Sequence, residues 1–228
     1  MPISISLDKT EIFDGLTNEQ ITRLLKRGKE VKLRPKNILF HQGDTADRCF
    51  LVIRGRLKLT KLNELGKEII LRYINCGEIT AATAVLRNQT YPLTAQSIDE
   101  TVVIGWDKPT MLALMRQYPD IAINLLGMVY DRIDEVQNRY LEMCTEQVDQ
   151  RIARSLLRLM RRAGIKTPAG IHIDIPLSRQ NIADYAGTTI YTVSRTLSMW
   201  EKKNWITSGR EKIIIKDQQA LVSLAEGV

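Results

Sequence analysis

The chain has few cysteines, few histidines and no long apolar run, and each scarcity excludes a class of protein. Of its 228 residues, three are cysteine and two are histidine. Cys49, Cys76 and Cys144 are too widely spaced for a disulfide framework or a CxxC metal pair, so a reducing compartment and no metal site are expected. No uncharged run approaches the roughly 18 residues that span a bilayer, so no membrane partner is expected. The start, MPISISLDKTE, lacks the pattern of a secretory signal, and the cytoplasm is the expected location.

The chain does contain the composition of a folded globular protein and an uneven distribution of charge. It is 44% hydrophobic and 26% charged, enough for one large domain or two small ones. Its net charge is +7, of which residues 1–146 carry +1 and residues 147–228 carry +6. A basic region beside a neutral one indicates either a polyanionic partner, most often nucleic acid, or a solvated basic face.

Short apolar runs separated by turns characterise residues 37–106. Glycine-bearing turns such as HQGD and RG punctuate runs that recur every 8–12 residues or so, which is typical of a β-sandwich or jelly roll. A short helix capped by Thr17 is expected before them. The predicted strands are residues 38–40, 50–53, 57–62, 69–74, 93–98 and 101–106.

A long helix is predicted over residues 120–147, and one apolar stripe follows its length. The stripe steps by 3, 4, 3, 4 and 3 residues, which is the seam of a coiled coil, and the remaining surface is mostly polar. This favours pairing with a second copy over packing against the chain's own sandwich. The stripe residues are Leu126, Val129, Ile133, Val136, Tyr140 and Met143.

Residues 178–200, SRQNIADYAGTTIYTVSRTLSMW, predict a helix-turn-helix. Ser178 precedes a short helix, Gly187 permits the sharp turn, and Thr189 can cap a second helix with an exposed polar face. A hairpin follows as a wing, with Arg210 and Lys212 at its tip. Together with the local basic charge, this pattern predicts binding to double-stranded DNA.

Five motifs, taken in order along the chain, resemble those of the cyclic-AMP receptor protein/FNR superfamily of bacterial transcription regulators. They are FHQGD (40–44), VIRG (52–55), GEI (77–79), SRQNIADYAG (178–187) and TVSRTL (192–197). The resemblance covers nearly the whole chain. It implies an α+β fold with a cyclic-nucleotide-binding-type β-roll at residues 1–118, a dimerisation helix at 119–147 and a winged helix-turn-helix domain at 148–228. It also implies an effector-responsive homodimer that reads a near-palindromic site and works with RNA polymerase.

By the same resemblance, the effector pocket would include Gly77, Glu78, Ile79, Gln89 and Thr90. Members that bind cyclic nucleotides place an Arg-Ser pair where this chain has Gln89 and Thr90, and the arginine neutralises the cyclic phosphate. Glutamine cannot offset that charge, so cyclic AMP is not the expected effector. The alternative interpretation has Glu78 stabilise a turn and Thr90 lie in an ordinary strand.

The cofactor is left open by the sequence. The oxygen-sensing branch holds an iron–sulfur cluster through clustered N-terminal cysteines, and no cysteine precedes Cys49, so such a cluster is not expected. The YPLTA segment at residues 91–95 resembles the FNR/nitric-oxide-responsive side of the superfamily, which leaves haem open. Its candidate ligands are His41, His172, a cysteine, a methionine or Pro2, although both histidines are expected to be structural. No neighbouring residue recognisably lowers the pKa of a thiol.

The second helix departs from the superfamily at one position. Many FNR-like members carry Glu-x-x-Ser-Arg, and this chain has Tyr191, Ser194 and Arg195 in those places. Arg195 is expected to read guanine, whereas Tyr191 can stack or touch a thymine methyl, so the half-site should differ where the glutamate would read. Arg179, Gln180, Thr189 and Thr192 would hold phosphates. The full predicted DNA-binding set is Arg179, Gln180, Thr189, Ile190, Tyr191, Thr192, Ser194, Arg195, Ser198, Arg210 and Lys212.

Two other functions are weaker fits. A roll-based enzyme acting on a nucleotide or sugar would need a His/Glu metal cluster, which two distant histidines do not supply. A roll-based protein that only binds a nucleotide or sugar stays open as an alternative. A cyclic-nucleotide-binding regulatory module attached to other machinery would not need residues 178–215. The sequence therefore predicts a DNA-binding regulator that responds to an unidentified small effector and is not an enzyme.

Overall fold

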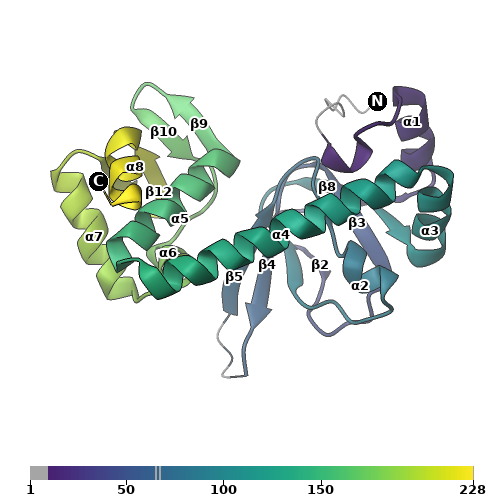
Figure 1. Ribbon diagram of the computed structural model, residues 1–228, viewed down its shortest axis with the longest axis horizontal. Helices are drawn as coiled ribbons and strands as arrows, with labels where there is room; N and C mark the ends of the chain where they lie inside the picture. Colours follow the sequence, from purple (N-terminus) through teal and green to yellow (C-terminus); the bar gives the residue numbers. More distant parts are fainter. Residues whose placement is uncertain (1–9, 65, 67, 228) are drawn as a thin grey trace. The chain divides into compact units, whose positions relative to one another are not determined.

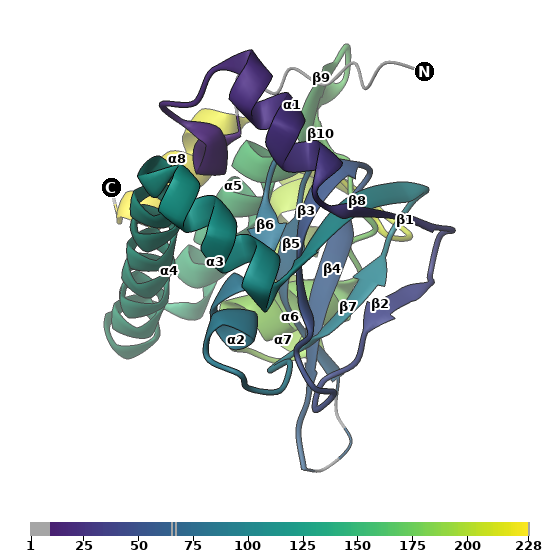
Figure 2. The same cartoon turned by 90° about the vertical axis from the view of Figure 1, so that its right-hand side faces the viewer.

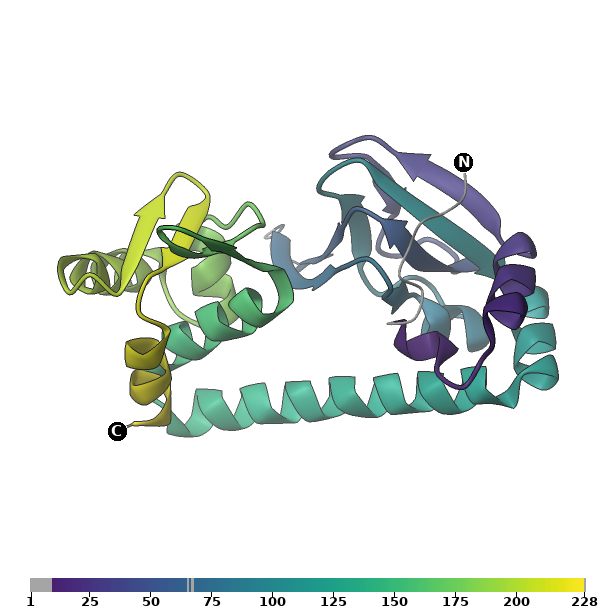
Figure 3. The same cartoon turned by 90° about the horizontal axis from the view of Figure 1, so that it is seen from above.

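The computed structural model describes residues 10–64, 66 and 68–227, which belong to two compact units, Met1–Asp134 and Glu135–Val228 (Figure 1). The division falls inside α4 (Pro119–Thr145), one continuous helix that contributes residues to both units (Figure 3). The predicted domain limits at residues 118/119 and 147/148 stay a prediction.

Unit 1 is a roll in which two four-stranded antiparallel sheets share one hydrophobic core (Figure 2). The sheets have the strand orders β1-β8-β3-β6 and β2-β7-β4-β5, which confirms the predicted jelly-roll class. The sequence analysis missed β1, because KEVKL is mostly charged and lies at a sheet edge beside β8. The strands are β1 (Lys29–Leu33), β2 (Ile38–Phe40), β3 (Arg48–Arg54), β4 (Leu57–Leu62), β5 (Glu68–Ile74), β6 (Ile79–Thr80), β7 (Thr94–Ser97) and β8 (Thr101–Asp107).

Local capping explains where the helices of unit 1 begin. Thr17 Oγ1 accepts a hydrogen bond from the Gln20 N–H, and Gln20 Oε1 accepts one from the Thr17 N–H, so the predicted cap is confirmed. Asp107 accepts from the Thr110 N–H, and hydrogen bonding from the side chain and then the backbone of Thr110 lowers the pKa of the Asp107 carboxyl. The helical segments are η2 (Glu11–Phe13), α1 (Asn18–Lys26), α2 (Ala82–Leu86), α3 (Lys108–Gln117) and the first part of α4, which buries Ile121, Leu125 and Met128.

The glycine of the VIRG motif is required by sterics. Gly55 has φ +80°, and a Cβ there would lie 2.5 Å from the Glu100 carbonyl oxygen and 2.6 Å from Thr101 Oγ1. No other residue fits this turn without displacing the Glu100–Thr101 backbone. The motif therefore marks a close approach of two loops of the roll.

Unit 2 contains the predicted winged helix-turn-helix. Its sheet has the order β11-β12-β10-β9, and β9 and the terminal α8 were not predicted. Helix α8 packs on α5 and buries Leu221 and Ala225. The elements are α5 (Val148–Ala163), β9 (Gly164–Thr167), β10 (Gly170–Ile173), α6 (Arg179–Ala186), α7 (Ile190–Lys202), β11 (Ile206–Gly209), β12 (Lys212–Ile215) and α8 (Gln218–Glu226).

Candidate nucleic-acid interface

Capping residues delimit the two helices of the helix-turn-helix. Ser178 Oγ accepts from the Asn181 N–H at 3.1 Å, and Asn181 Oδ1 accepts from the Ser178 N–H at 2.9 Å. Gly187 ends α6 with φ +62° in the left-handed region. Thr189 Oγ1 then accepts from the Thr192 N–H at 3.2 Å and starts α7. The apolar residues of the two helices that form their shared core are all buried: Ile182, Ala183, Ala186, Val193, Leu197 and Trp200.

The opposite face of α7 is exposed. Tyr191 is 83% exposed, and Arg195 and Ser198 lie on the same stripe at i+4 and i+7. Arg195 makes no ion pair with any described residue. Thr192 and Ser194 are half-buried at the edge of this stripe, and Ile190 is exposed at the start of the helix. A rigid helix therefore offers one cationic, one aromatic and one hydroxyl side chain in a row.

The wing is tied to α7 through one carboxylate. Glu201 Oε1 accepts from the Ser208 N–H at 2.7 Å and from its hydroxyl at 2.8 Å. Arg210 and Lys212 are exposed at the turn between β11 and β12. Arg179 and Gln180 are also exposed, at the start of α6. All eleven residues of the predicted DNA-binding set thus lie in unit 2.

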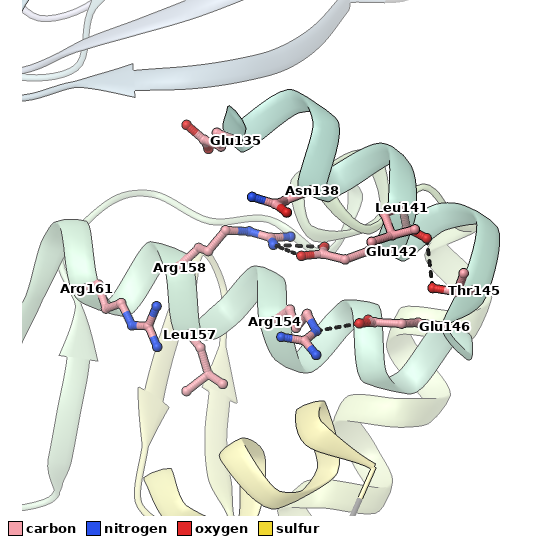
Figure 4. A pocket seen from close by; sticks show the side chains of 10 residues that line it. All are labelled: Glu135, Asn138, Leu141, Glu142, Thr145, Glu146, Arg154, Leu157, Arg158 and Arg161. Atoms are coloured by element: carbon pink, nitrogen blue, oxygen red, sulfur yellow. Dashed lines mark hydrogen bonds and ion pairs between the residues drawn. The ribbon is translucent and has the colours of Figure 1, made fainter. Parts of the chain in front are cut away.

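Ion pairs join α4 to α5 in an antiparallel arrangement that the sequence analysis did not foresee. Glu142 accepts from Arg158 Nη1 with both oxygens, at 2.6 and 2.8 Å, and Glu146 accepts from Arg154 Nε at 2.7 Å (Figure 4). Further along, Glu135 Oε2 lies 2.9 Å from Arg162 Nη2. We call these three pairs the α4–α5 zipper. The signal in the sequence that could have predicted it is a series of glutamates, at 135, 142 and 146, followed by a series of arginines, at 154, 158 and 162.

A cavity of about 410 Å³ lies between α4 and α5 beside the zipper (Figure 4). Its lining includes the zipper pairs of Glu142 and Glu146, together with the exposed Leu141. Arg161 also lines it and makes no ion pair with a described residue. Most of the charge in this cavity is therefore neutralised within the protein.

Arg151 connects the end of α4 to the turn of the helix-turn-helix. Its guanidinium donates to the carbonyl oxygens of Glu146 at 2.8 Å, Ala186 at 3.0 Å and Gly187 at 3.4 Å. Met143 lies against the same turn, with its Cε 3.3 Å from where a Cβ of Gly187 would be. The turn between α6 and α7 is thus in contact with the last turns of α4 and the residue that follows them.

The apolar stripe of α4 points away from the zipper. Leu126, Ile133, Val136, Tyr140 and Met143 are 52–71% exposed, and only Val129 is half-buried. The stripe is therefore largely left without a partner in the described part of the chain. It is also wider than predicted, because three further apolar residues of α4 are exposed: Ile123, Tyr130 and Leu141.

In the roll, the predicted effector residues separate into two groups. Glu78 accepts from Arg72 Nη2 with Oε1 and from the Asn75 N–H with Oε2, both at 2.8 Å, so its carboxylate stabilises the turn around Gly77. Ile79 is buried in β6. Gln89 and Thr90 are exposed after α2, and no hydrogen bond or ion pair among the described residues joins them to Glu78. Arg72, the one cation in strand β5 (EIILRYI), was not singled out by the sequence analysis.

Comparison with known proteins agrees with both units. A family model for the cyclic nucleotide-binding domain matches residues 30–118, and one for the Crp-like helix-turn-helix domain matches residues 150–224. The chain belongs to the CRP/FNR superfamily of transcription regulators. Like other members, it is an effector-responsive DNA-binding regulator, and no enzyme family is indicated for it.

Relatives within the CRP/FNR superfamily are distant but full-length. The transcriptional activator protein anr of Pseudomonas aeruginosa is 26% identical over 100% of this chain and 88% of its own. A CRP-like cAMP-activated global transcriptional regulator of Mycobacterium tuberculosis is 22% identical over 96% of this chain and 98% of its own.

Solved structures of the superfamily share the fold. The catabolite activator protein of Thermus thermophilus matches with a TM-score of 0.56 and 24% identity, covering 95% of this chain and 99% of that one. The c-di-GMP responsive global regulator CLP of Xanthomonas campestris matches with a TM-score of 0.74 and 17% identity, covering 87% and 99%.

The two histidines named as candidate haem ligands belong to different units. His41 is exposed in the roll and His172 lies in β10 of unit 2, while Pro2 lies outside the described residues. No group of three or more His, Cys, Asp or Glu side chains in the described ranges could hold a metal ion. Burial raises the pKa of Cys49 to about 12 and also raises the pKa of Cys76, so both thiols resist ionisation. None of the described helices is long and apolar enough to cross a bilayer.

The contacts of Arg151 predict a loss of stability when its guanidinium is removed. Arg151→Met leaves the Glu146, Ala186 and Gly187 carbonyls without this donor and should lower the free energy of unfolding by about 2 kcal/mol. Arg161→Met, on the same helix but without an ion pair, should change it by less than about 0.5 kcal/mol. Urea denaturation of both variants measures the difference, and equal losses would contradict the assignment.

Proposed function

We propose that the protein acts as a homodimer that reads an inverted-repeat DNA site with α7 of each copy, in response to a signal received by the roll. The observation that carries the proposal is the exposed stripe of Tyr191, Arg195 and Ser198 on a helix whose other face is fully buried. A helix presented in this way fits the major groove, and Arg195 can pair bidentately with guanine O6 and N7. Arg179, Arg210 and Lys212 supply exposed charge for the phosphate backbone.

The two faces of α4 support the dimer. One face holds α5 through the zipper, and the other is an exposed apolar stripe with heptad spacing. Burying such a stripe against a second copy removes large apolar side chains from water. Two-fold pairing would bring two copies of α7 to one DNA site, where RNA polymerase is the expected further partner.

The signal received by the roll is proposed to be something other than cyclic AMP. Gln89 brings no charge, and Arg72, the cation beside Glu78, is already paired with it at 2.8 Å. A cyclic phosphate would therefore find no free cation among these residues. An iron–sulfur cluster is not part of the proposal, because no cysteine precedes Cys49; haem is the cofactor that the sequence leaves open.

Arg195→Ala should lower the preference for the specific site over random DNA by about 1–3 kcal/mol, because the guanine contact is lost. Arg210→Ala, at the wing, should weaken binding to both DNAs by the same factor, because a phosphate contact carries no sequence information. Fluorescence anisotropy with the chain's own upstream region and a scrambled duplex measures both. Equal, weak binding by wild type and Arg195→Ala would refute specific reading through α7.

Ile133→Asp should convert the dimer into a monomer, since two carboxylates would be buried at the seam. Sedimentation velocity measures the change, and Thr83→Asp, exposed on α2, is the matched control that should stay dimeric. A dimer that survives Ile133→Asp would show that the stripe is not the interface.

Adding cyclic AMP should leave the melting temperature of the purified protein and its DNA affinity unchanged, because Gln89 carries no charge and Arg72 is already paired with Glu78. Differential scanning fluorimetry and anisotropy measure the two effects, and a saturable rise in either would contradict the proposal. An absorption spectrum of the same sample decides on haem, which a Soret band would establish.

A further inference from the structure

Helix α7 lacks the groups that recognise cytosine or adenine. Its sequence, IYTVSRTLSMWEK, contains no asparagine, glutamine or aspartate and a single glutamate, Glu201. That carboxylate accepts two hydrogen bonds from Ser208, at 2.7 and 2.8 Å, and holds the wing. In the major groove, cytosine is read by an acidic acceptor and adenine by a bidentate amide. Neither kind of reader is free on α7.

The exposed side chains of α7 that can discriminate between bases are a cation and two apolar groups. Arg195 is exposed and without an ion pair to a described residue, and arginine reads guanine. Ile190 and Tyr191 are 38% and 83% exposed, and apolar groups read the thymine methyl. Serine, represented by Ser198, discriminates little between bases.

Tyr191 and Arg195 lie one helical turn apart on α7, so they can contact different bases. Tyr191 lies in the first turn of α7 and Arg195 one turn later on the same stripe, so the two side chains are neighbours about 6 Å apart at Cβ. That spacing suits bases one or two steps apart. Thr189 and Thr192 do not compete for these bases, because their hydroxyls lie 3.1 Å from each other within the helix cap.

We propose that each α7 reads only guanine and thymine, with Arg195 on the guanine and the ring of Tyr191 on a thymine methyl one or two steps away. Ile190 borders the same methyl. The inference rests on the proposed DNA reading by α7 and deepens it by naming the two bases. Tyr191 is thereby the residue that sets the half-site apart from sites read by an acidic side chain at this position.

The first test is selection from duplexes with a randomised inverted repeat. Wild type should enrich half-sites with guanine and thymine one or two steps apart, and Tyr191→Phe should enrich the same sites because it keeps the ring. Tyr191→Glu should replace the thymine by cytosine and leave the guanine unchanged. Enrichment of a G·C pair, in either orientation, by wild type at the position that Tyr191→Glu alters, or no alteration by that variant, would overturn the inference.

The second test removes only the methyl group. Replacing the selected thymine by deoxyuracil should weaken wild-type binding about fourfold, the effect of one buried methyl. Tyr191→Ala should bind both duplexes equally, whereas Ser198→Ala should keep the difference. An equal affinity of wild type for the two duplexes would overturn the thymine contact.

The outcomes of these tests distinguish a failure of the thymine contact from a failure of specific DNA binding through α7. If wild type enriches no sequence at all, specific DNA reading fails and the inference falls with it. If wild type enriches a site that depends on Arg195 but not on Tyr191, specific reading stands and only the thymine contact is wrong.

Discussion

The pairing of α4 with α5 is the interaction on which the DNA-reading unit depends. Its three glutamate–arginine pairs have side chains that are 14–34% exposed, so they are partly withdrawn from water. A single surface pair contributes little, but removing one member of a half-buried pair leaves a charge without compensation. Arg151 extends the arrangement to the carbonyls of Ala186 and Gly187, at the turn before α7. The recognition helix is therefore positioned from the long helix through continuous hydrogen bonds.

Helix α4 holds α5 through charged side chains and also exposes an apolar stripe. The helical period places these two sets of side chains on different sides of the helix. Residues 135, 142 and 146 lie on one side, where they hold α5, and Ile133, Tyr140 and their neighbours lie on the other. In the proposed dimer, a change in how Val136, Tyr140 and Met143 pair would shift the acidic side as well, because both lie on the part of α4 that belongs to unit 2. The zipper can then carry the change to α5 and to the recognition turn. This is the physical route by which an effector-responsive regulator of this architecture can couple its two functions.

The parts of the fold that could be predicted are those specified by local chemistry. Ser178, Gly187 and Thr189 delimit the helix-turn-helix through caps and a left-handed turn, which depend on near neighbours in the sequence. Strand β1 and helix α8 escaped prediction because tertiary packing rather than pattern decides them. The role of Glu78 was open for the same reason, since only the fold shows Arg72 beside it. The zipper required knowing which faces of two helices meet, and a heptad count does not contain that information.

The α4–α5 zipper also determines how much of the charge of unit 2 is free to meet DNA. Counted from residue 147 the region carries +6, but the folded unit begins at Glu135 and has 14 basic against 10 acidic residues, a net of +4. The three zipper arginines are neutralised within the protein and have no counterions to release to DNA. The charges that remain exposed include those of Arg179, Arg195, Arg210 and Lys212, at the helix-turn-helix and its wing. The salt dependence of DNA binding therefore reports on these elements and not on the three zipper arginines, although α5 contains five arginines in all.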